Sequence, residues 1–524
     1  MKIFGKSYNE ISLNKNLYPY KILYNDSFSN RPFIQLNFEN KKDKNYYFED
    51  IFTIYMEKLF EMFFDEVELE FKDKKNNKNI IQIILVIGIP DNYNYFQRKI
   101  IEKLFQTHIF PKITDISNSF LDYKQEHLTL PSSKSSTSLS MHSSKNKYKK
   151  KLYGGYQIAL KQIKIENNSS IANLCFKPNF ETIRNILLIN INGDSTNLSL
   201  ASIYQEKDSE NDKRKYLYEI KKENLITIGE GDLIDNFIEQ KLKIKNEHNI
   251  EAKDNLNINH ICSLRKLCNE IIQKINKNNI EYTLEENNIK KEFLKSLNDI
   301  YSKIILSIKK MIRHETINEN NINAIVLIGS LSRTTTFIQM LKKLFKYNKD
   351  ITKQLINLES MNDLPFYNDE IYEDYYIAAG AAIQSYNLGT LVNKYILLDI
   401  CPISFGIESL DGLMDFVIEK GDKIPKLNQK FIKIKRNNAN CKNENFLEIN
   451  IYEGENKEVN KNKLISCVNI DKKNFNNEKI TNNYIEILIQ FEIDKYFNLK
   501  VFVLEPKTLK RRFECLINID IIRG

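Results

Sequence analysis

The chain has little of several features on which whole classes of protein depend. Glycine supplies only 15 of its 524 residues, about 3% against roughly 7% in an average protein, so few positions can offer bare backbone to a phosphate. The cysteines number seven and form no CxxC pair, which argues against a disulfide framework and a zinc site. No apolar segment suits a signal peptide, and the longest apolar run, residues 80–89, is too short to cross a bilayer. We therefore expect a cytoplasmic protein that contacts no membrane.

Charge of both signs is spread along the chain. The 77 basic and 68 acidic residues leave a net charge of +9, and the lysines are scattered among asparagines. A nucleic-acid-binding protein concentrates basic and aromatic residues on one element, whereas here only residues 147–151 form a tight basic run. We expect no nucleic-acid partner. The composition, 42% hydrophobic and 28% charged, predicts a folded globular protein of two to four domains.

The first three quarters of the sequence predict a mixed α/β domain. Apolar residues at helical spacing over residues 47–64 predict a helix, and an Asn192-Gly193 turn joins two segments of alternating apolar residues. The predicted strand over residues 324–328 meets Gly329 and then the start of a helix. Such a turn can cradle a phosphate, because the first N–H groups of a helix are unpaired, but every α/β protein has turns of this kind.

Two other stretches differ in composition from this domain. Residues 124–151 are rich in Ser and Lys and predict a disordered insertion, for which a regulatory loop and a neutral insertion are both open. The last part of the chain alternates apolar residues with others, which predicts an antiparallel β-sandwich. The alternating segments are residues 447–451, 485–493, 499–503 and 513–521.

Four blocks of sequence, in the same order and at similar intervals, resemble the heat-shock protein 70 chaperone family. The resemblance covers nearly the whole chain outside the Ser-rich insertion, and it is most specific where an apolar linker meets the predicted sandwich. The four blocks are residues 324–333, Asp374 with residues 379–384, residues 396–408 and Tyr452–Glu455.

This resemblance implies a fold of the α/β class: an actin-like (ribonuclease H-like) nucleotide-binding domain followed by an antiparallel β-sandwich that binds peptides. Because residues 2–6 resemble a segment well inside the first lobe of the family, we expect the first phosphate loop and the catalytic lysine to be missing. The helical lid that follows the sandwich is also expected to be missing. The implied divisions are residues 1–392 for the nucleotide-binding domain, 230–315 within it for a helical subdomain, 393–400 for the linker and 401–524 for the sandwich.

The resemblance also implies a chaperone that binds unfolded or extended apolar peptides, with ATP or ADP and magnesium in the first domain controlling peptide release. J-domain co-chaperones and nucleotide-exchange factors are the implied partners, and no metal-ligating side chain is assigned. A second hypothesis stays open: the chain is a non-catalytic pseudo-chaperone or a regulator of another chaperone.

Several positions depart from the family in ways that weaken ATP hydrolysis. Asn190 and Asn197 stand where the family has aspartates, and Asp194 stands in the second phosphate loop where the family has glycine. Phosphoryl transfer depends on magnesium and on carboxylates that hold it, so neutral amides remove charge that the reaction needs. We therefore expect the ATPase activity to be weak or lost. The positions that contact the base in the family fall on Asn269, Ile272 and Gln273.

The resemblance assigns roles to particular residues of this chain. The catalytic positions fall on Asp115 and Ser195, and the nucleotide-binding positions on Gly193, Ser195, Gly229, Gly329, Arg333 and Asp374. The linker and allosteric positions fall on Pro90, Ile396, Leu397, Leu398 and Asp399. The apolar peptide-groove positions fall on Phe405, Ile407, Leu410, Phe431, Leu447, Ile449 and Ile487. Alternation alone would assign the same apolar residues to an ordinary sandwich core.

Overall fold

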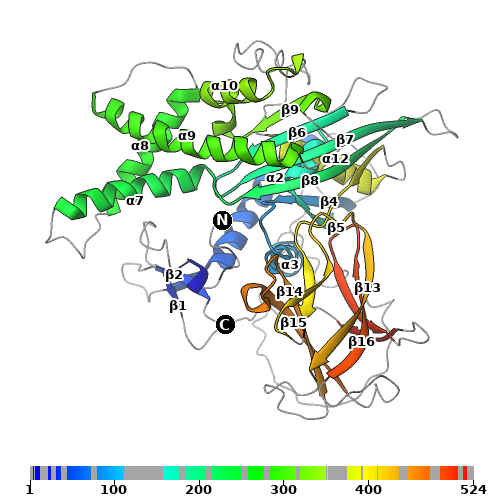
Figure 1. Ribbon diagram of the computed structural model, residues 1–524. Helices are drawn as coiled ribbons and strands as arrows, with labels where there is room; N and C mark the ends of the chain where they lie inside the picture. The colour runs from blue at the N-terminus through cyan, green and yellow to red at the C-terminus, as the bar shows by residue number, and fades with distance from the viewer. Residues whose placement is uncertain are drawn as a thin grey trace.

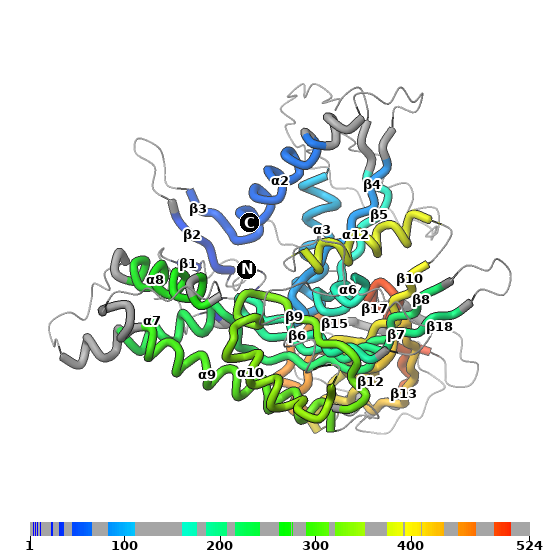
Figure 2. Tube along the Cα trace, turned by 90° about the horizontal axis from the view of Figure 1, so that it is seen from above, coloured from blue at the N-terminus to red at the C-terminus, as the bar shows by residue number. Residues whose placement is uncertain are grey.

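A computed structural model gives the arrangement of the chain (Figures 1 and 2). Of the predicted site residues, Asp115, Asp374 and Leu410 lie outside the part of the chain that the structure describes, as does the Ser-rich stretch 124–151. The described residues are 8–11, 22–24, 31–36, 44–71, 80–110, 157–175, 184–207, 214–248, 258–276, 284–313, 319–349, 375–390, 394–409, 411–435, 446–471, 484–504 and 511–515, together with Phe4, Lys6 and Ile351.

A five-stranded sheet lies at the centre of the first part of the chain. Its order is β10-β8-β7-β6-β9; β7 is antiparallel to both neighbours, and the edge strands β9 and β10 are parallel to theirs. The apolar run at residues 186–189 is fully buried in β6, as expected for a strand covered on both faces. The predicted Asn192-Gly193 turn joins β6 to β7. The bounds are β6 Arg184–Ile191, β7 Thr196–Lys207, β8 Arg214–Ile226, β9 Ala324–Ile328 and β10 Tyr395–Leu398.

One face of this sheet packs against a group of four helices, of which α7 and α8 extend beyond the edge of the sheet (Figure 1). Leu187 of β6 packs in one apolar cluster with Phe237, Tyr301 and Phe337, which come from three different helices. Apolar residues at helical spacing direct one face of each helix into this cluster. The bounds are α7 Glu230–His248, α8 Ile258–Asn276, α9 Leu284–Arg313 and α10 Thr335–Leu344, with the short 3₁₀ turns η3 Glu319–Asn321 and η4 Ser330–Arg333.

A second group of elements lies against the other face of the sheet. Leu188 of β6 packs against Ala172 of helix α6 and Tyr376 of helix α12, and these helices also contact the parallel strand pair β4–β5. The predicted helix at 47–64 is confirmed as α2 and extends further. The bounds are α1 Tyr8–Ile11, β1 Ile22–Tyr24, β2 Pro32–Leu36, β3 Lys44–Tyr47, α2 Phe48–Phe71, β4 Ile80–Ile89, α3 Tyr95–Leu104, the π-helix η2 Phe105–Ile109, β5 Gln157–Asn167, α6 Asn168–Asn173 and α12 Tyr376–Gly389.

Two four-stranded antiparallel sheets, which we call the C-terminal sheet pair, follow the linker strand β10 (Figure 1). Their orders are β12-β11-β14-β15 and β13-β16-β17-β18. Inward side chains of both sheets, such as Ile407, Ile451 and Ile489, share one buried cluster, as period-two alternation predicts. The bounds are β11 Phe405–Glu408, β12 Met414–Ile418, β13 Lys426–Lys435, β14 Phe446–Glu453, β15 Lys463–Asp471, β16 Tyr484–Ile493, β17 Leu499–Leu504 and β18 Arg511–Cys515, with the 3₁₀ turn η6 Val459–Lys461.

Membrane-spanning helices were not expected from the sequence. Of the helices in the described ranges, none combines the length and the apolar character that crossing a bilayer requires. This agrees with the lack of long apolar runs.

Two glycines of α12 test how closely α12 packs on α6. A Cβ added at Gly380 would lie 2.0 Å from the carbonyl oxygen of Ile171 in α6, whereas one at Gly389 would lie 3.1 Å from the Cδ1 atom of Ile84. We expect Gly380→Ala to lower the free energy of unfolding by about 1–3 kcal/mol, because backbone must move to admit the methyl group. Gly389→Ala is the matched control and should leave stability unchanged or raise it by up to about 1 kcal/mol. Urea unfolding measures both, and equal effects would contradict this close packing.

Candidate functional site

Three separate segments bring four of the predicted nucleotide-binding residues together. The β6–β7 turn carries Gly193 and Ser195 and is closed by a 2.8 Å hydrogen bond from Asn192 N to Ser195 O. A Cβ added at Gly229 would lie 2.3 Å from the Asn192 carbonyl oxygen. Gly329 has a φ of 89°, and an added Cβ there would lie 2.2 Å from the Ile191 carbonyl oxygen. Glycine is therefore required at both approaches to the turn, which we call the glycine cradle (Gly193, Ser195, Gly229, Gly329).

The N-terminus of α7 is occupied by the chain itself. The N–H of Glu230 donates to the Asn192 carbonyl at 2.8 Å, and the N–H of Gly231 donates to the Gly193 carbonyl at 2.7 Å. The N–H of Gly229 donates to the Asp232 carboxylate at 3.0 Å. Helix N-termini bind anions through unpaired N–H groups. Here the N–H groups of Glu230 and Gly231 bond the β6–β7 turn and that of Gly229 bonds Asp232, so all three are already paired.

The predicted residue Arg333 lies at the end of η4, directly after the glycine cradle. Its charge reaches Tyr376 of α12, where it opposes the rise in the Tyr376 pKa that burial and Cys175 cause. The charge of Arg333 therefore acts on a residue of α12, on the other face of the five-stranded sheet. Burial and then the Asp194 carboxylate raise the pKa of Tyr93, which lies in a turn where Tyr93 N donates to Pro90 O at 3.0 Å.

A pair of buried amides occupies the sheet next to the cradle. Asn190 and Asn197 are directly opposite each other in the β6–β7 register, and their exposed fractions are 0% and 1%. None of their four side-chain nitrogen and oxygen atoms has a hydrogen-bond partner. Leaving such atoms unpaired costs about 1–3 kcal/mol each.

The residues at this place do not fit a magnesium ion. Two neutral amides replace the carboxylates that hold a hydrated divalent cation. Within the described ranges, no three His, Cys, Asp or Glu side chains come together as a metal site.

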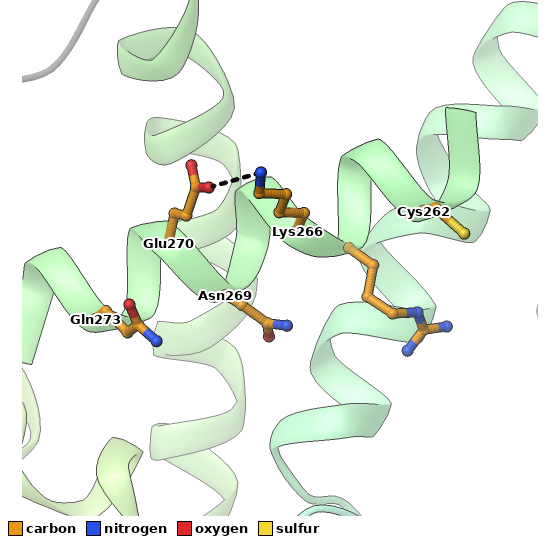
Figure 3. Close-up of a pocket in the computed structure, with 6 residues that line it drawn as sticks. Cys262, Lys266, Asn269, Glu270 and Gln273 are labelled. Carbon is orange, nitrogen blue, oxygen red and sulfur yellow. Dashed lines mark ion pairs between the residues drawn. The ribbon is translucent and has the colours of Figure 1, made fainter. Parts of the chain in front are cut away.

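An open pocket of about 440 Å³ lies on the exposed side of α8 (Figure 3). Asn269 and Gln273, two of the predicted base-contact positions, line it and lie one helical turn apart. The third of these positions, Ile272, is 3% exposed and packs in the helical core, because its position on α8 faces α7 and α9. The other lining residues are Cys262, Arg265, Lys266 and Glu270.

This pocket is charged and adjoins the cradle side of the helices. Arg265 forms an ion pair with Asp235 of α7 at 2.6 Å, and Lys266 lies 3.9 Å from Glu270 (Figure 3). Helix α8 also contacts η4, the turn that follows Gly329. The helix that carries the polar and basic residues of the pocket therefore also contacts the turn that follows the glycine cradle.

The linker docks on the five-stranded sheet as its edge strand β10. Tyr395 to Leu398 pair in parallel with Tyr216 to Glu219 of β8, and the rings of Tyr395 and Tyr216 stack at 5.7 Å. Ile396 and Leu397 are half-buried, whereas Leu398 is exposed. Docking thus covers two of the three apolar linker residues and places Asp399 at the end of the strand.

Asp399 is buried in a cluster of ionisable groups. The hydroxyl of Ser170 lies 2.9 Å from Asp399 Oδ1 and 3.1 Å from Glu223 Oε1. A hydroxyl has one proton, so Ser170 can donate fully to only one of these two carboxyl groups, and burial raises the pKa of both. Ser169 Oγ donates a further hydrogen bond to Glu223 at 2.8 Å.

The charge count of this cluster points the same way. Its cations are Arg98, 4% exposed, and Lys164, which is paired with Glu166. Arg98 donates to the Tyr93 carbonyl and to Asn167 Oδ1 and acts electrostatically on Asp91, Asp399 and Glu223. One guanidinium therefore faces three carboxyl groups.

The C-terminal sheet pair contacts α3 directly beyond the linker. The N–H of Tyr95 donates to Glu453 Oε2 at 2.8 Å, and the Tyr95 ring lies 5.9 Å from Phe405 and 6.0 Å from Phe497. Lys99 of α3 bonds Asn498. Tyr95 belongs to the apolar cluster of the sheet pair, so one core spans both parts of the chain.

The sequence model of the family described as "Hsp70 protein" matches residues 232–508. This match covers more than half of the 524 residues. The chain belongs to the Hsp70 family. Members of this family act as chaperones and bind ATP or ADP with magnesium, and the matched region runs from α7 to the end of β17.

The predicted peptide-groove residues of this Hsp70 protein separate into two sets. Phe405, Ile407, Ile449 and Ile487 are 0–1% exposed and lie in the cluster shared by the two sheets. Phe431 is 57% exposed, because Ile432 is the residue of β13 that pairs with Ile487 and faces inward. Phe431 therefore does not share the inward face, and a reading shifted by one residue would have selected Ile432.

Sequence reasoning assigned Asp399 to the linker without predicting its burial, and it missed Glu453, although two signals point to these junction carboxyl groups. Glu453 follows Ile449 and Ile451 at period two, which places it on the buried face of β14. Asp399 is a charged residue between apolar neighbours, Leu398 and Ile400. A charge at a position where the pattern requires an apolar residue is a sign of a buried site.

Docking of the sheet pair in this Hsp70 protein should depend on pH. Burial, with repulsion by Glu166, raises the pKa of Asp399 to about 7, and burial raises the pKa of Glu453 to about 7. Both groups have ordinary carboxyl pKa values when the linker and the sheet pair are undocked, so the docked state binds more protons. Protonation of these groups therefore stabilises docking fully at pH values below the ordinary carboxyl pKa, and this stabilisation is lost as the pH rises through about 7.

Small-angle X-ray scattering measures this docking. We expect a larger radius of gyration at about pH 8.5 than at about pH 6. The double variant Asp399→Asn, Glu453→Gln removes these two titrating groups and should give a smaller difference in radius between the two pH values, since Asp91 and Glu223, whose pKa values burial also raises, remain. A wild-type protein with identical scattering at the two values would contradict proton-linked docking.

Proposed function

We propose that this Hsp70 protein binds exposed apolar segments of unfolded proteins as a chaperone and that its ATP hydrolysis is weak or lost. In this proposal the described elements form an actin-like nucleotide-binding domain and a peptide-binding β-sandwich joined by the docked linker. The main observation in support of weak or lost hydrolysis is the buried amide pair Asn190 and Asn197. Cytoplasmic location, J-domain co-chaperones and nucleotide-exchange factors remain part of the proposal by family analogy.

Two features of the glycine cradle support weak ATP turnover. Phosphoryl transfer relies on positioning and on neutralisation of the developing charge. Around the cradle, Asp194, Glu230 and Asp232 bring negative charge close to where phosphates would lie, and the N–H groups of Glu230 and Gly231 already donate to the β6–β7 turn. A nucleotide held there would gain little of the electrostatic stabilisation that hydrolysis needs.

Peptide binding, in this proposal, requires the sheet pair to leave α3. Phe405 is sealed by Tyr95 while docked, and Ile407, Ile449 and Ile487 have no exposed surface for a ligand to contact. Undocking removes the Tyr95–Glu453 hydrogen bond and the aromatic contacts of Tyr95. The linker would thus set whether an extended apolar segment can bind.

The buried groove positions also favour a second candidate function. A protein that stays docked keeps these positions closed and would act on another chaperone through its nucleotide-domain surface. Binding of apolar peptide to the isolated protein separates the two candidates, because a permanently docked regulator would bind none.

The ATP part of the proposal predicts insensitivity to magnesium. We expect the melting temperature of the wild-type protein to be the same in Mg-ATP and in EDTA, since a ligand that binds weakly shifts stability little. The double variant Asn190→Asp, Asn197→Asp should be less stable in EDTA, because it buries two like charges. Added Mg²⁺ should then raise its melting temperature. Steady ATP turnover by the wild type that EDTA abolishes would contradict the proposal.

Two isoleucines of β16 test the peptide part. Ile487 is a predicted groove position, whereas Ile489 is not, and both are 0% exposed in the same cluster. We expect Ile487→Ala and Ile489→Ala to destabilise the fold equally, by about 2–5 kcal/mol. Only Ile487→Ala should weaken binding of a labelled apolar heptapeptide, measured by fluorescence anisotropy with wild-type affinity in the micromolar range or weaker. Equal losses of affinity would remove the groove assignment.

A further inference from the structure

Exposed apolar side chains of this protein gather on one helix. Fifteen large apolar side chains are exposed among the described residues, and five of them lie within residues 54–63 of α2. Single exposed apolar residues are ordinary, whereas a contiguous group marks an interaction site. The five are Ile54, Tyr55, Leu59, Met62 and Phe63, with exposed fractions of 40–62%.

The spacing of four of these residues makes a continuous stripe. Tyr55, Leu59, Met62 and Phe63 follow one another at intervals of four, three and one residue, which places them on one side of α2. The opposite side is anchored: Phe60 and Phe64 are buried, and Phe60 contacts Phe105 and Phe110. Figure 2 shows α2 above the five-stranded sheet and clear of helices α7 to α10. The stripe therefore lies on the side of α2 opposite the side that packs against the rest of the protein.

The charge of α2 contrasts with that of the whole chain. The helix has eight acidic residues and a single lysine, whereas the chain has a net charge of +9. Lys58 is already paired with Glu61 at 3.1 Å. Of the acidic side chains that the structure describes, Glu49 is buried and paired with Arg31 at 2.9 Å, whereas Asp50 and Glu66 are exposed on either side of the stripe along the helix. The stripe thus lies within a strongly negative element.

We propose that this α2 surface docks a basic amphipathic helix of a partner protein. The residues of the apolar stripe have the i, i+3 and i+4 spacing through which amphipathic helices pack their apolar faces together. The acidic residues favour lysine or arginine beside the anchors and steer the encounter by long-range attraction. A second copy of this chain fits less well, because two α2 helices would bring their acidic residues together.

This inference concerns a surface separate from the glycine cradle and the sheet pair, and it does not rest on the proposed function. The probe is a synthetic amphipathic peptide of leucine and lysine of about 18 residues, five helical turns, with a leucine–glutamate peptide of the same pattern for comparison. Fluorescence anisotropy with the full chain measures both. We expect the lysine peptide to bind, the glutamate peptide not to bind, and the affinity to fall as salt is raised.

Matched variants locate the binding. The double variant Leu59→Gln, Met62→Gln removes two anchors without adding charge and should weaken binding of the lysine peptide by about tenfold or more. Leu306→Gln is the control, because Leu306 is also exposed, 53%, but lies on α9. Circular dichroism should show both variants folded, since the replaced side chains are at the surface. Unchanged affinity in the α2 variant would overturn the proposal.

Two other occupants of the stripe are distinguished by the same set of proteins. A dimer in light scattering that the α2 double variant breaks would overturn the proposal by assigning the stripe to a second copy. Binding that appears only after residues 124–151 are deleted would overturn it by assigning the stripe to the Ser- and Lys-rich stretch of this chain. A monomer that binds the lysine peptide with or without those residues supports a separate basic partner.

Discussion

Parallel pairing of the linker strand with β8 is the contact on which the arrangement of this protein depends. The register that sets Leu398 opposite Glu219 also fixes where the strand ends, and Asp399 is therefore held against Ser170. The same pairing brings Phe405 to Tyr95 of α3. Burial of a carboxyl group is costly unless it is protonated or paired, so the docked arrangement is tied to the protonation of a few residues at this junction.

The short helix α6 connects this junction with the candidate nucleotide site. Ser170 bonds Asp399 on the linker side, and Asn173 donates to Ser199 of β7, two residues from the buried amide Asn197. Helix α6 therefore makes hydrogen bonds both to the linker and to the strand that carries Asn197. This is a continuous physical connection between the glycine cradle and the C-terminal sheet pair. The proposed loss of magnesium chemistry at the cradle would leave protonation at the junction as a control on docking.

Alternation and turn chemistry predicted much of this fold, because they report local geometry. The Asn192-Gly193 turn, the strand at residues 324–328 and the mixed α/β content followed from patterns of period two and 3.6. Side-chain direction was less predictable: Phe431 and Ile432 are both apolar, and only the pairing with Ile487 decides which faces inward. The cluster of Asp91, Arg98, Glu223 and Asp399 joins residues about 300 positions apart in sequence, and no local pattern reports such contacts.

Amide hydrogen exchange of the linker strand, in nucleotide-free protein at mildly acidic pH, tests this account most directly. If the linker docks as an edge strand without help from ATP, the amides of residues 395–398 that bond β8 will exchange slowly, like those of the sheet interior. Exchange at the rate of an unstructured peptide would contradict the account. It would mean that the linker is undocked under these conditions and that the buried carboxyl cluster does not hold the two parts of the chain together.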